Sequence, residues 1–180
     1  MTALRLTVLA ALLSVSGALA LPADAQQRDT LVKGFALSND KPIQIESDNL
    51  EIREQEKKAF FNGNVRVVQG PTTLRSSRMI VYYKGEGGSI SEGQSDIDRI
   101  EVFGNVSLAS GTQSAKGENG SFDMRTELLV LEGKQVVLAD GPNVFTGCKL
   151  TVQMGTGQAK LDSCGGRVKI LVVPKSSKTN

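Results

Sequence analysis

The side chains best suited to chemistry in this sequence are a group of three carboxylates and a pair of cysteines. Asp96, Asp98 and Glu101 lie close together along the chain, and paired carboxylates supply the acid and base steps of glycoside hydrolysis. Cys148 and Cys164 can pair with each other or contribute to a metal site. The chain has no histidine, which excludes histidine-dependent acid–base catalysis, Ser-His-Asp triads and most zinc hydrolases.

The three carboxylates border a segment rich in glycine, serine and acidic residues, from residue 85 to residue 98. This composition is typical of a mobile, solvent-exposed loop, so we interpret the acidic group as part of a solvated turn rather than as a catalytic pair. We therefore predict that the protein is not an enzyme and uses no cofactor.

The first 25 residues have the features of a signal peptide. Arg5 precedes an apolar run over residues 6–21, and small-x-small cleavage motifs follow at residues 18–20 and 23–25. An uncleaved membrane anchor is the alternative, but the run is short for a span of about 20 residues and Pro22 follows at once. We predict an exported protein whose mature chain begins near Gln26.

Export to an oxidising compartment affects the expected pairing state of the two cysteines. In an oxidising compartment an even number of cysteines favours a disulfide, whereas a zinc site would lack its usual histidine ligands. Two buried free thiols are the remaining alternative. We predict a disulfide between Cys148 and Cys164, and no metal site.

Composition points to one all-β domain. The 180 residues are 39% hydrophobic, enough for a single core, and the 19 glycines with only 4% aromatic residues suit short strands joined by tight turns. The formal net charge is +2, and no block of basic residues is interleaved with aromatic ones, so nucleic acid is not an expected partner.

A repeated pattern organises the chain: an apolar strand, a corner centred on glycine, and an alternating strand. The corners fall at Gly63, Gly104, Gly133 and Gly166, which are 41, 29 and 33 residues apart. Repeats of this length indicate units that bury their apolar faces only by stacking on their neighbours. The sequence therefore predicts stacked antiparallel β units with one continuous core.

Alternation within each unit predicts which side chains face inward, because successive residues of a strand point to opposite faces. We call these side chains the inward set. Counted from the glycine corners, its members on the strands are Phe61, Val65, Val67, Val81, Tyr83, Val102, Val106, Leu108, Met124, Leu131, Val136, Leu138 and Val152. Val168, Ile170 and both cysteines belong to the same set.

The two ends of the stack should be unpaired strand edges able to add a strand from another molecule. Ile43 and Ile45 mark the first edge, beside Pro42, and Val168, Ile170 and Val172 mark the second. We expect residues 26–40 to form a linker, residues 41–174 to form the domain, and residues 175–180 to form a flexible tail. Turn signals rich in glycine cover residues 111–120 and 140–143.

Four segments carry a resemblance to a known family. They are Pro-Ile-Gln-Ile-Glu-Ser-Asp at residues 42–48, Phe-Asn-Gly-Asn-Val-Arg-Val-Val-Gln-Gly at 61–70, Leu-Val-Leu-Glu-Gly at 129–133 and Arg-Val-Lys-Ile-Leu-Val-Val-Pro at 167–174. In this order behind a signal peptide, they resemble the OstA-like family of periplasmic lipopolysaccharide-transport proteins, of which LptA is a member. The resemblance covers residues 41–174.

The resemblance implies a single open, twisted β-jellyroll in the periplasm that carries lipopolysaccharide from the inner to the outer membrane. It implies that the acyl chains of lipid A are shielded by the inward set, with Val106 and Leu138 expected at the mouth of the groove. The implied partners are an inner-membrane protein similar to LptC, an outer-membrane translocon similar to LptD, and further copies of the chain joined head to tail. Loop 85–98 and the cysteine pair depart from the family pattern.

Without the resemblance, the inward residues would be interpreted as an ordinary closed core. Two further alternatives remain open from the sequence: an anchored subunit similar to LptC, and a structural periplasmic adaptor that binds partners without carrying lipid.

Overall fold

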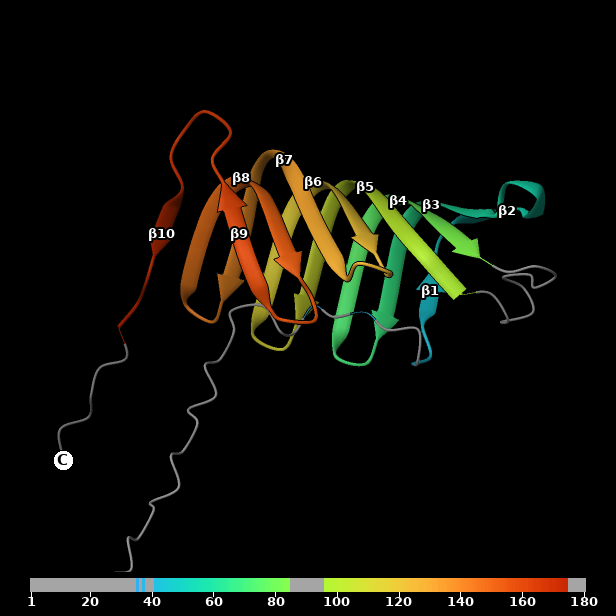
Figure 1. Ribbon diagram of the computed structural model, residues 1–180, viewed down its shortest axis with the longest axis horizontal. Coiled ribbons are helices and arrows are strands. Elements are labelled where there is room, and N and C mark those ends of the chain that lie inside the picture. The colour runs from blue at the N-terminus through green and yellow to red at the C-terminus, as the bar shows by residue number, and fades with distance from the viewer. Residues whose placement is uncertain (1–34, 36, 38–40, 85–95, 175–180) are drawn as a thin grey trace, which may run out of the picture.

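The computed structural model describes residues 35, 37, 41–84 and 96–174, and within these residues it is almost entirely antiparallel β-sheet (Figure 1). A turn of 3₁₀ helix, Glu54–Glu56, lies between the second and third strands. The strands are β1 (Gln44–Glu46), β2 (Asn49–Arg53), β3 (Lys58–Gln69), β4 (Thr72–Lys84), β5 (Asp96–Ser110), β6 (Gln113–Asp123), β7 (Leu128–Asp140), β8 (Asn143–Gln153), β9 (Gln158–Asp162) and β10 (Lys169–Leu171).

The sheet is open because its first and last strands do not pair with each other. Its order is β1-β3-β4-β5-β6-β7-β8-β10, with β2 also paired to β3 and β9 also paired to β8. Each of the long strands β3 to β8 is hydrogen-bonded to the next one along the chain, so the sheet is a series of consecutive antiparallel hairpins, as the repeats predict.

Each long strand bends near its middle and thereby contributes to two facing walls. Pairing is interrupted there, for example between Asn62 and Val65 in β3 and between Phe103 and Val106 in β5. Such bulges bend a strand and increase its twist. The bend in β3 uses the left-handed backbone region, with φ of 79° at Gly63 and 48° at Asn64. Short side chains and glycine tolerate that region best.

We call the two walls after their first strands. The β2 wall contains β2, β9 and the halves of the long strands between them, and the β1 wall contains β1, β10 and the other halves. Two-residue turns close the hairpins of the β1 wall, at 70–71, 111–112 and 141–142. The predicted turn over 111–120 is therefore too long, because residues from Gln113 onward belong to β6.

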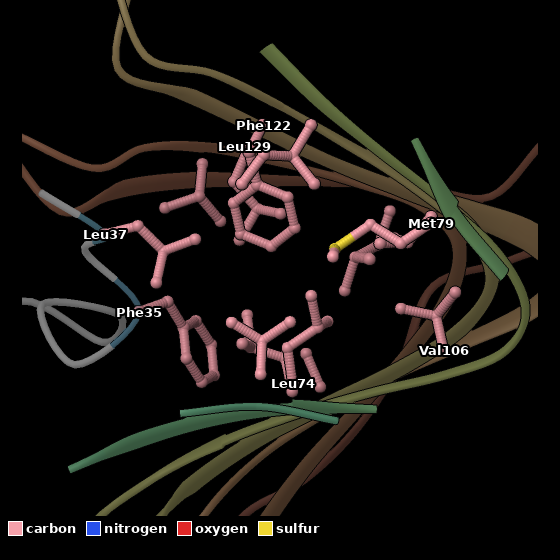
Figure 2. Close-up of a cluster of buried hydrophobic side chains, with 14 of the residues drawn as sticks. Phe35, Leu37, Leu74, Met79, Val106, Phe122 and Leu129 are labelled. Carbon is pink, nitrogen blue, oxygen red and sulfur yellow. The ribbon is translucent and has the colours of Figure 1, made fainter. Parts of the chain in front are cut away.

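The core fills the space between the walls. Apolar side chains alternate with exposed or half-buried ones along β3, β5 and β7, and their inward members are almost fully buried. Figure 2 shows these side chains between the two walls, with Val106 beside the bend. Phe35 and Leu37 enter the same cluster from the side opposite the bend, and they precede the first strand.

Several predicted segments lie outside the described residues: the signal peptide over 1–25, most of the linker over 26–40, the part of the loop from residue 85 to 95, and the tail over 175–180. In the part of the chain that is described, no helix is long and apolar enough to cross a membrane.

Candidate functional site

The interior between the walls is the candidate site, and two rows of paired residues define it. On the β2 wall, the cross-strand register runs inward-facing residues from Leu50 through Phe61, Met79, Val102, Gly120, Leu131 and Leu150 to Leu161. On the β1 wall, the corresponding row is Ile45, Val67, Leu74, Leu108, Ala115, Leu138, Phe145 and Ile170. Both rows are apolar across the whole sheet.

The structure places most of the predicted inward set inside. Twelve of the thirteen lipid-contact candidates are buried, and Met124 is half-buried against the core. The buried members are Phe61, Val65, Val67, Val81, Tyr83, Val102, Val106, Leu108, Leu131, Val136, Leu138 and Val152. The expectation that Val106 lies at the mouth is wrong, because its side chain lies at the bend, where the walls meet (Figure 2).

Tyr83 differs from the other inward residues because it carries a polar group. Its ring is buried, and its hydroxyl donates a hydrogen bond of 2.9 Å to Oε2 of Glu54, an exposed residue. Burial, reinforced by the neighbouring carboxylate, raises the pKa of the Tyr83 hydroxyl above its ordinary value. The ring is therefore buried beside the 3₁₀ turn, outside the core cluster, with Nζ of Lys57 5.9 Å from its centre, and the hydroxyl is tied to that turn.

Aromatic rings on the outer face of the β2 wall are covered by cations. The guanidinium carbon of Arg53 lies 4.4 Å from the centre of the Phe60 ring, and that of Arg78 lies 4.7 Å from the Phe103 ring. Arg99 stacks in the same way on Tyr82, at 4.2 Å. Such stacking shields an outward ring while leaving the charge in water. The two faces of the wall are thus chemically distinct.

Two of the three carboxylates considered as catalytic candidates have separate structural partners. Asp98 forms an ion pair with Lys84, while Glu101 accepts a hydrogen bond of 2.9 Å from the Tyr82 hydroxyl and pairs with Arg99 at 3.3 Å. Asp96 begins β5 and is exposed. The group is therefore integrated into the outer surface of β4 and β5, and no group of His, Cys, Asp and Glu suited to a metal occurs in the described residues.

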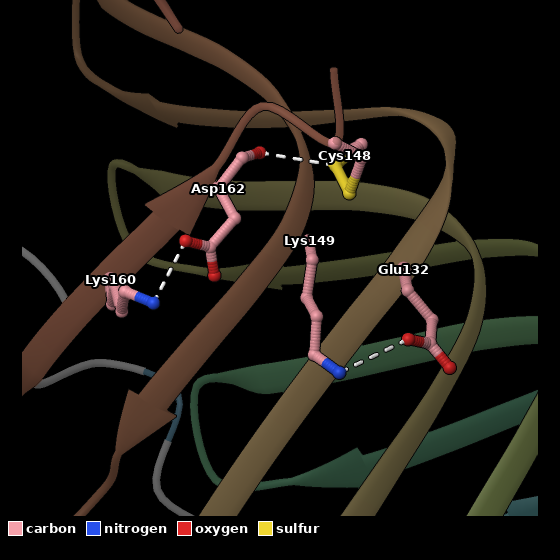
Figure 3. Close-up of a disulfide and its surroundings, with 6 residues drawn as sticks. Glu132, Cys148, Lys149, Lys160 and Asp162 are labelled. Carbon is pink, nitrogen blue, oxygen red and sulfur yellow. Dashed lines mark hydrogen bonds and ion pairs between the residues drawn. A yellow bond between two sulfur atoms is a disulfide. The ribbon is translucent and has the colours of Figure 1, made fainter.

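A disulfide joins Cys148 and Cys164, as predicted, with their Cα atoms 5.9 Å apart (Figure 3). Cys148 is buried in β8, and its Sγ lies 3.2 Å from the carbonyl oxygen of Asp162. The predicted inward orientation of Cys164 is wrong: Cys164 is exposed, with φ of 45°, in the turn after β9. The turn exists because the chain crosses from the β2 wall to the β1 wall here without a continuous strand.

The disulfide fastens that crossing to β8. Gly147 precedes Cys148, and a Cβ there would lie 2.5 Å from the carbonyl oxygen of Asp162, so only glycine permits the approach. Ion pairs flank the crossing on the outer surface, between Lys160 and Asp162 at 2.8 Å and between Lys149 and Glu132 at 3.4 Å (Figure 3).

The last strand exposes apolar side chains. Ile170 pairs with Phe145 and therefore belongs to the inward row, yet it is 60% exposed, and Val168 is 38% exposed. Ile170 thus has the predicted inward register, but neither residue is buried, because beyond β10 the described chain provides no further strand to cover them. Leu171, Val172 and Val173 are also exposed. At the first edge, Ile43 and Ile45 are half-buried against the core.

The fold described above has known relatives. The family model of the LptA/(LptD N-terminal domain) LPS transport protein matches residues 44–158. The chain belongs to this family. Most of the inward rows fall within the matched residues, whereas Cys164 and β10 lie beyond them.

Two rhizobial proteins are similar in sequence to this member of the LptA/LptD N-terminal-domain family. An uncharacterized protein of Rhizobium meliloti (strain 1021) is 56% identical over 156 residues, which cover 87% of this chain and 84% of the relative. A Rhizobium etli protein, from the 5′ region of an rpoN-linked probable transport protein, is 73% identical over 44 residues, 24% of this chain and 82% of that protein.

The crystal structure of LptH from Pseudomonas aeruginosa, the periplasmic LptA homologue of the lipopolysaccharide transport device, matches with a TM-score of 0.63. The match covers 76% of this chain and 98% of that one at 17% identity, so it shows a shared fold. The family's open β-jellyroll is thus the fold of this chain.

The predicted inward set omitted several buried residues of this family member's interior; those on the strands include Ala59, Leu74, Met79, Ile100, Ala115, Phe122 and Leu129. Three further residues, before the strands or at the end of the stack, were also missed. Phe35 and Leu37 lie in the range predicted as linker, but they are 0% and 9% exposed within the core cluster. Their apolar character was the available signal, although their polar surroundings concealed it. Leu50 is the inward residue of the terminal strand β2 and is 54% exposed. Its alternation with Ile52 indicated a strand, but nothing local showed that the strand ends the stack.

Proposed function

We propose that the protein is a periplasmic bridge component that carries lipopolysaccharide from the inner to the outer membrane, with the acyl chains shielded between its walls. One observation carries the proposal: both inward rows remain apolar from the first strands to the last, in a chain of the LptA/LptD N-terminal-domain family. Membership in a transport family is what distinguishes this interior from an ordinary core.

Acyl chains suit this interior because it offers apolar contact and few polar groups. Each methylene that leaves water for such surroundings contributes about 0.8 kcal/mol. The sugar and phosphate groups of the lipid would remain in water, because burying an unpaired charge is far more costly. The inward side chains are packed together in the structure, so lipid entry requires the walls to separate or resident side chains to leave.

The exposed ends support head-to-tail assembly. Leu50 and Ile170 belong to the inward rows of the two walls, at opposite ends of the sheet, and each is more than half exposed. A second copy whose β1 and β2 continue from β10 and β9 would cover them and prolong the apolar interior. The same edges would accept jellyroll domains similar to LptC and LptD at the two membranes.

Photo-crosslinking from neighbouring residues of one strand tests the proposal. Phe61 faces the interior, whereas Phe60 faces outward beneath Arg53, so p-benzoylphenylalanine at either position differs only in the face it reports. In the exported protein incubated with purified lipopolysaccharide, we expect crosslinks from position 61 and few from position 60. Equal crosslinking from both positions, or none from position 61 in a folded variant, would contradict an interior lipid path.

A further inference from the structure

Two buried side chains of the interior do not come from the sheet. Phe35 and Leu37 are 0% and 9% exposed, and both belong to the core cluster formed by the two walls. Figure 2 shows them on a segment at the side opposite the bend, Phe35 toward Leu74 of the β1 wall and Leu37 toward Phe122 and Leu129 of the β2 wall. They therefore occupy the space where the two walls are farthest from their shared bend.

Phe35 and Leu37 lie outside the strands of the sheet whose interior they enter. Neither residue takes part in the described strand pairings, and both side chains pack within the core cluster. Withdrawing the two side chains therefore breaks no described strand pairing. At Lys41, the next described residue, the carbonyl oxygen accepts a hydrogen bond of 3.0 Å from Nε2 of Gln69 at the end of β3.

A phenylalanine and a leucine present the same chemistry as an acyl chain: apolar surface, no charge and no hydrogen-bonding side-chain group. We propose that Phe35 and Leu37 form an internal plug that occupies the open side of the lipid-binding interior and is displaced by the acyl chains of the cargo. This inference rests on the proposed function, because it assigns a resident occupant to the same site.

Displacement has two consequences. The plug keeps the apolar interior covered between cargo molecules, when exposed acyl-binding surface would favour aggregation. It also competes with the lipid: if the site is free for a tenth of the time, the apparent affinity is reduced about tenfold. Release of lipid is then assisted because the plug can return to its place.

Thiol accessibility distinguishes displacement of the plug from opening of the whole domain. Phe35→Cys reports the plug, and Leu74→Cys reports the adjacent β1 wall, where Leu74 is 1% exposed. The two native cysteines are paired and do not react. Without lipid we expect both introduced thiols to resist maleimide. With saturating purified lipopolysaccharide we expect the reaction at position 35 to become about tenfold faster, while position 74 stays protected.

Lipid binding is measured on the same samples by co-sedimentation, with lipopolysaccharide stripped of its acyl chains as the control. Failure to bind intact lipopolysaccharide would overturn the proposed function and the plug together. Binding with position 35 still protected would overturn only the plug. Faster reaction at both positions would show opening of the whole domain and would likewise overturn it.

Affinity gives a second, independent test. The double variant Phe35→Ala and Leu37→Ala weakens the competitor, so we expect its affinity for lipopolysaccharide to rise, by up to about tenfold. Leu74→Ala removes apolar surface from the wall and should lower the affinity. If the double variant remains folded and its affinity falls, Phe35 and Leu37 line the lipid site and do not compete for it, which overturns the plug.

Discussion

Asn64 holds Asp48 at the bend of β3, where its Nδ2 donates a hydrogen bond of 2.8 Å to Oδ2 of Asp48. The backbone N–H of Asp48 also donates to the carbonyl oxygen of Gly63, at 3.0 Å. Asp48 lies between β1 and β2, where the chain crosses from one wall to the other. The first crossing is thus fastened by hydrogen bonds to β3, whereas the last crossing is fastened by the disulfide to β8.

Gly63→Ala should destabilise the domain through this contact. The residue has φ of 79°, and an added Cβ would collide with the carboxylate of Asp48 and approach its Cβ at 3.0 Å. The left-handed backbone costs about 1–2 kcal/mol for alanine, and loss of the hydrogen bond to Asn64 adds about 1 kcal/mol. We expect a decrease in unfolding free energy of about 2–3 kcal/mol, measured by urea denaturation.

Gly70→Ala is the matched control for that prediction. Gly70 has φ of 55°, but nothing lies within 4 Å of the position that an added Cβ would take, so it isolates the backbone contribution. Equal destabilisation by the two substitutions would show that the Asp48 contact adds nothing to the stability of the bend.

Removal of the disulfide should weaken the other end of the stack. Cys148 and Cys164 are 16 residues apart, and closing a loop of that length stabilises a fold by about 3 kcal/mol in the chain-entropy model. We expect the variant with both cysteines replaced by alanine to lose about that much unfolding free energy, and to exchange backbone hydrogens faster over residues 163–171. Intact mass after alkylation decides whether the bond exists. Two modified thiols without prior reduction would contradict it.

Tyr83 should produce a loss of stability at alkaline pH. Burial raises the pKa of its hydroxyl in the folded protein above the value of about 10 in an unfolded chain. The neutral hydroxyl is therefore favoured by folding, and its contribution is present below pH 10 and is lost as the pH rises through the raised value. Urea denaturation across this range should show a steeper decline for the native protein than for Tyr83→Phe. Identical slopes would show that the hydroxyl ionises as freely in the folded protein as in the unfolded chain.

Sequence alternation predicted the interior well because each inward position is decided locally, by the pleat of its own strand. Val102 and Leu131 illustrate this, since both lie between polar or half-buried neighbours and both are fully buried. Alternation failed where burial depends on what lies beyond the strand. Ile170 has inward register but no strand beyond it in the described residues, and Cys164 falls in a crossing where the pleat is interrupted.

The plug residues were missed for a related reason. Phe35 and Leu37 are buried by contact with strands far along the chain, and their immediate neighbours carry no strand pattern. The register of the glycine-rich strand β6 was also hidden, because Gly117 and Gly120 suggested a turn. In the structure Gly120 faces the interior, where an added Cβ would lie 2.6 Å from Leu131, so this glycine serves close packing.

Single charges at the two ends should prevent head-to-tail association without unfolding the domain. Ile170 and Leu50 are 60% and 54% exposed, so Ile170→Asp and Leu50→Asp keep their carboxylates in water, and we expect melting temperatures close to that of the native protein. Each variant alone should sediment as a monomer at concentrations where the native chain assembles, because a charge then faces the apolar surface of a neighbour. Mixing the two variants is the decisive measurement. The Leu50→Asp chain keeps an intact β9–β10 end, and the Ile170→Asp chain keeps an intact β1–β2 end. In a head-to-tail contact these two intact ends meet, and the mixture should form a dimer and nothing larger. A contact between two identical ends predicts a different result: one variant would still dimerise alone, and mixing would add no new species.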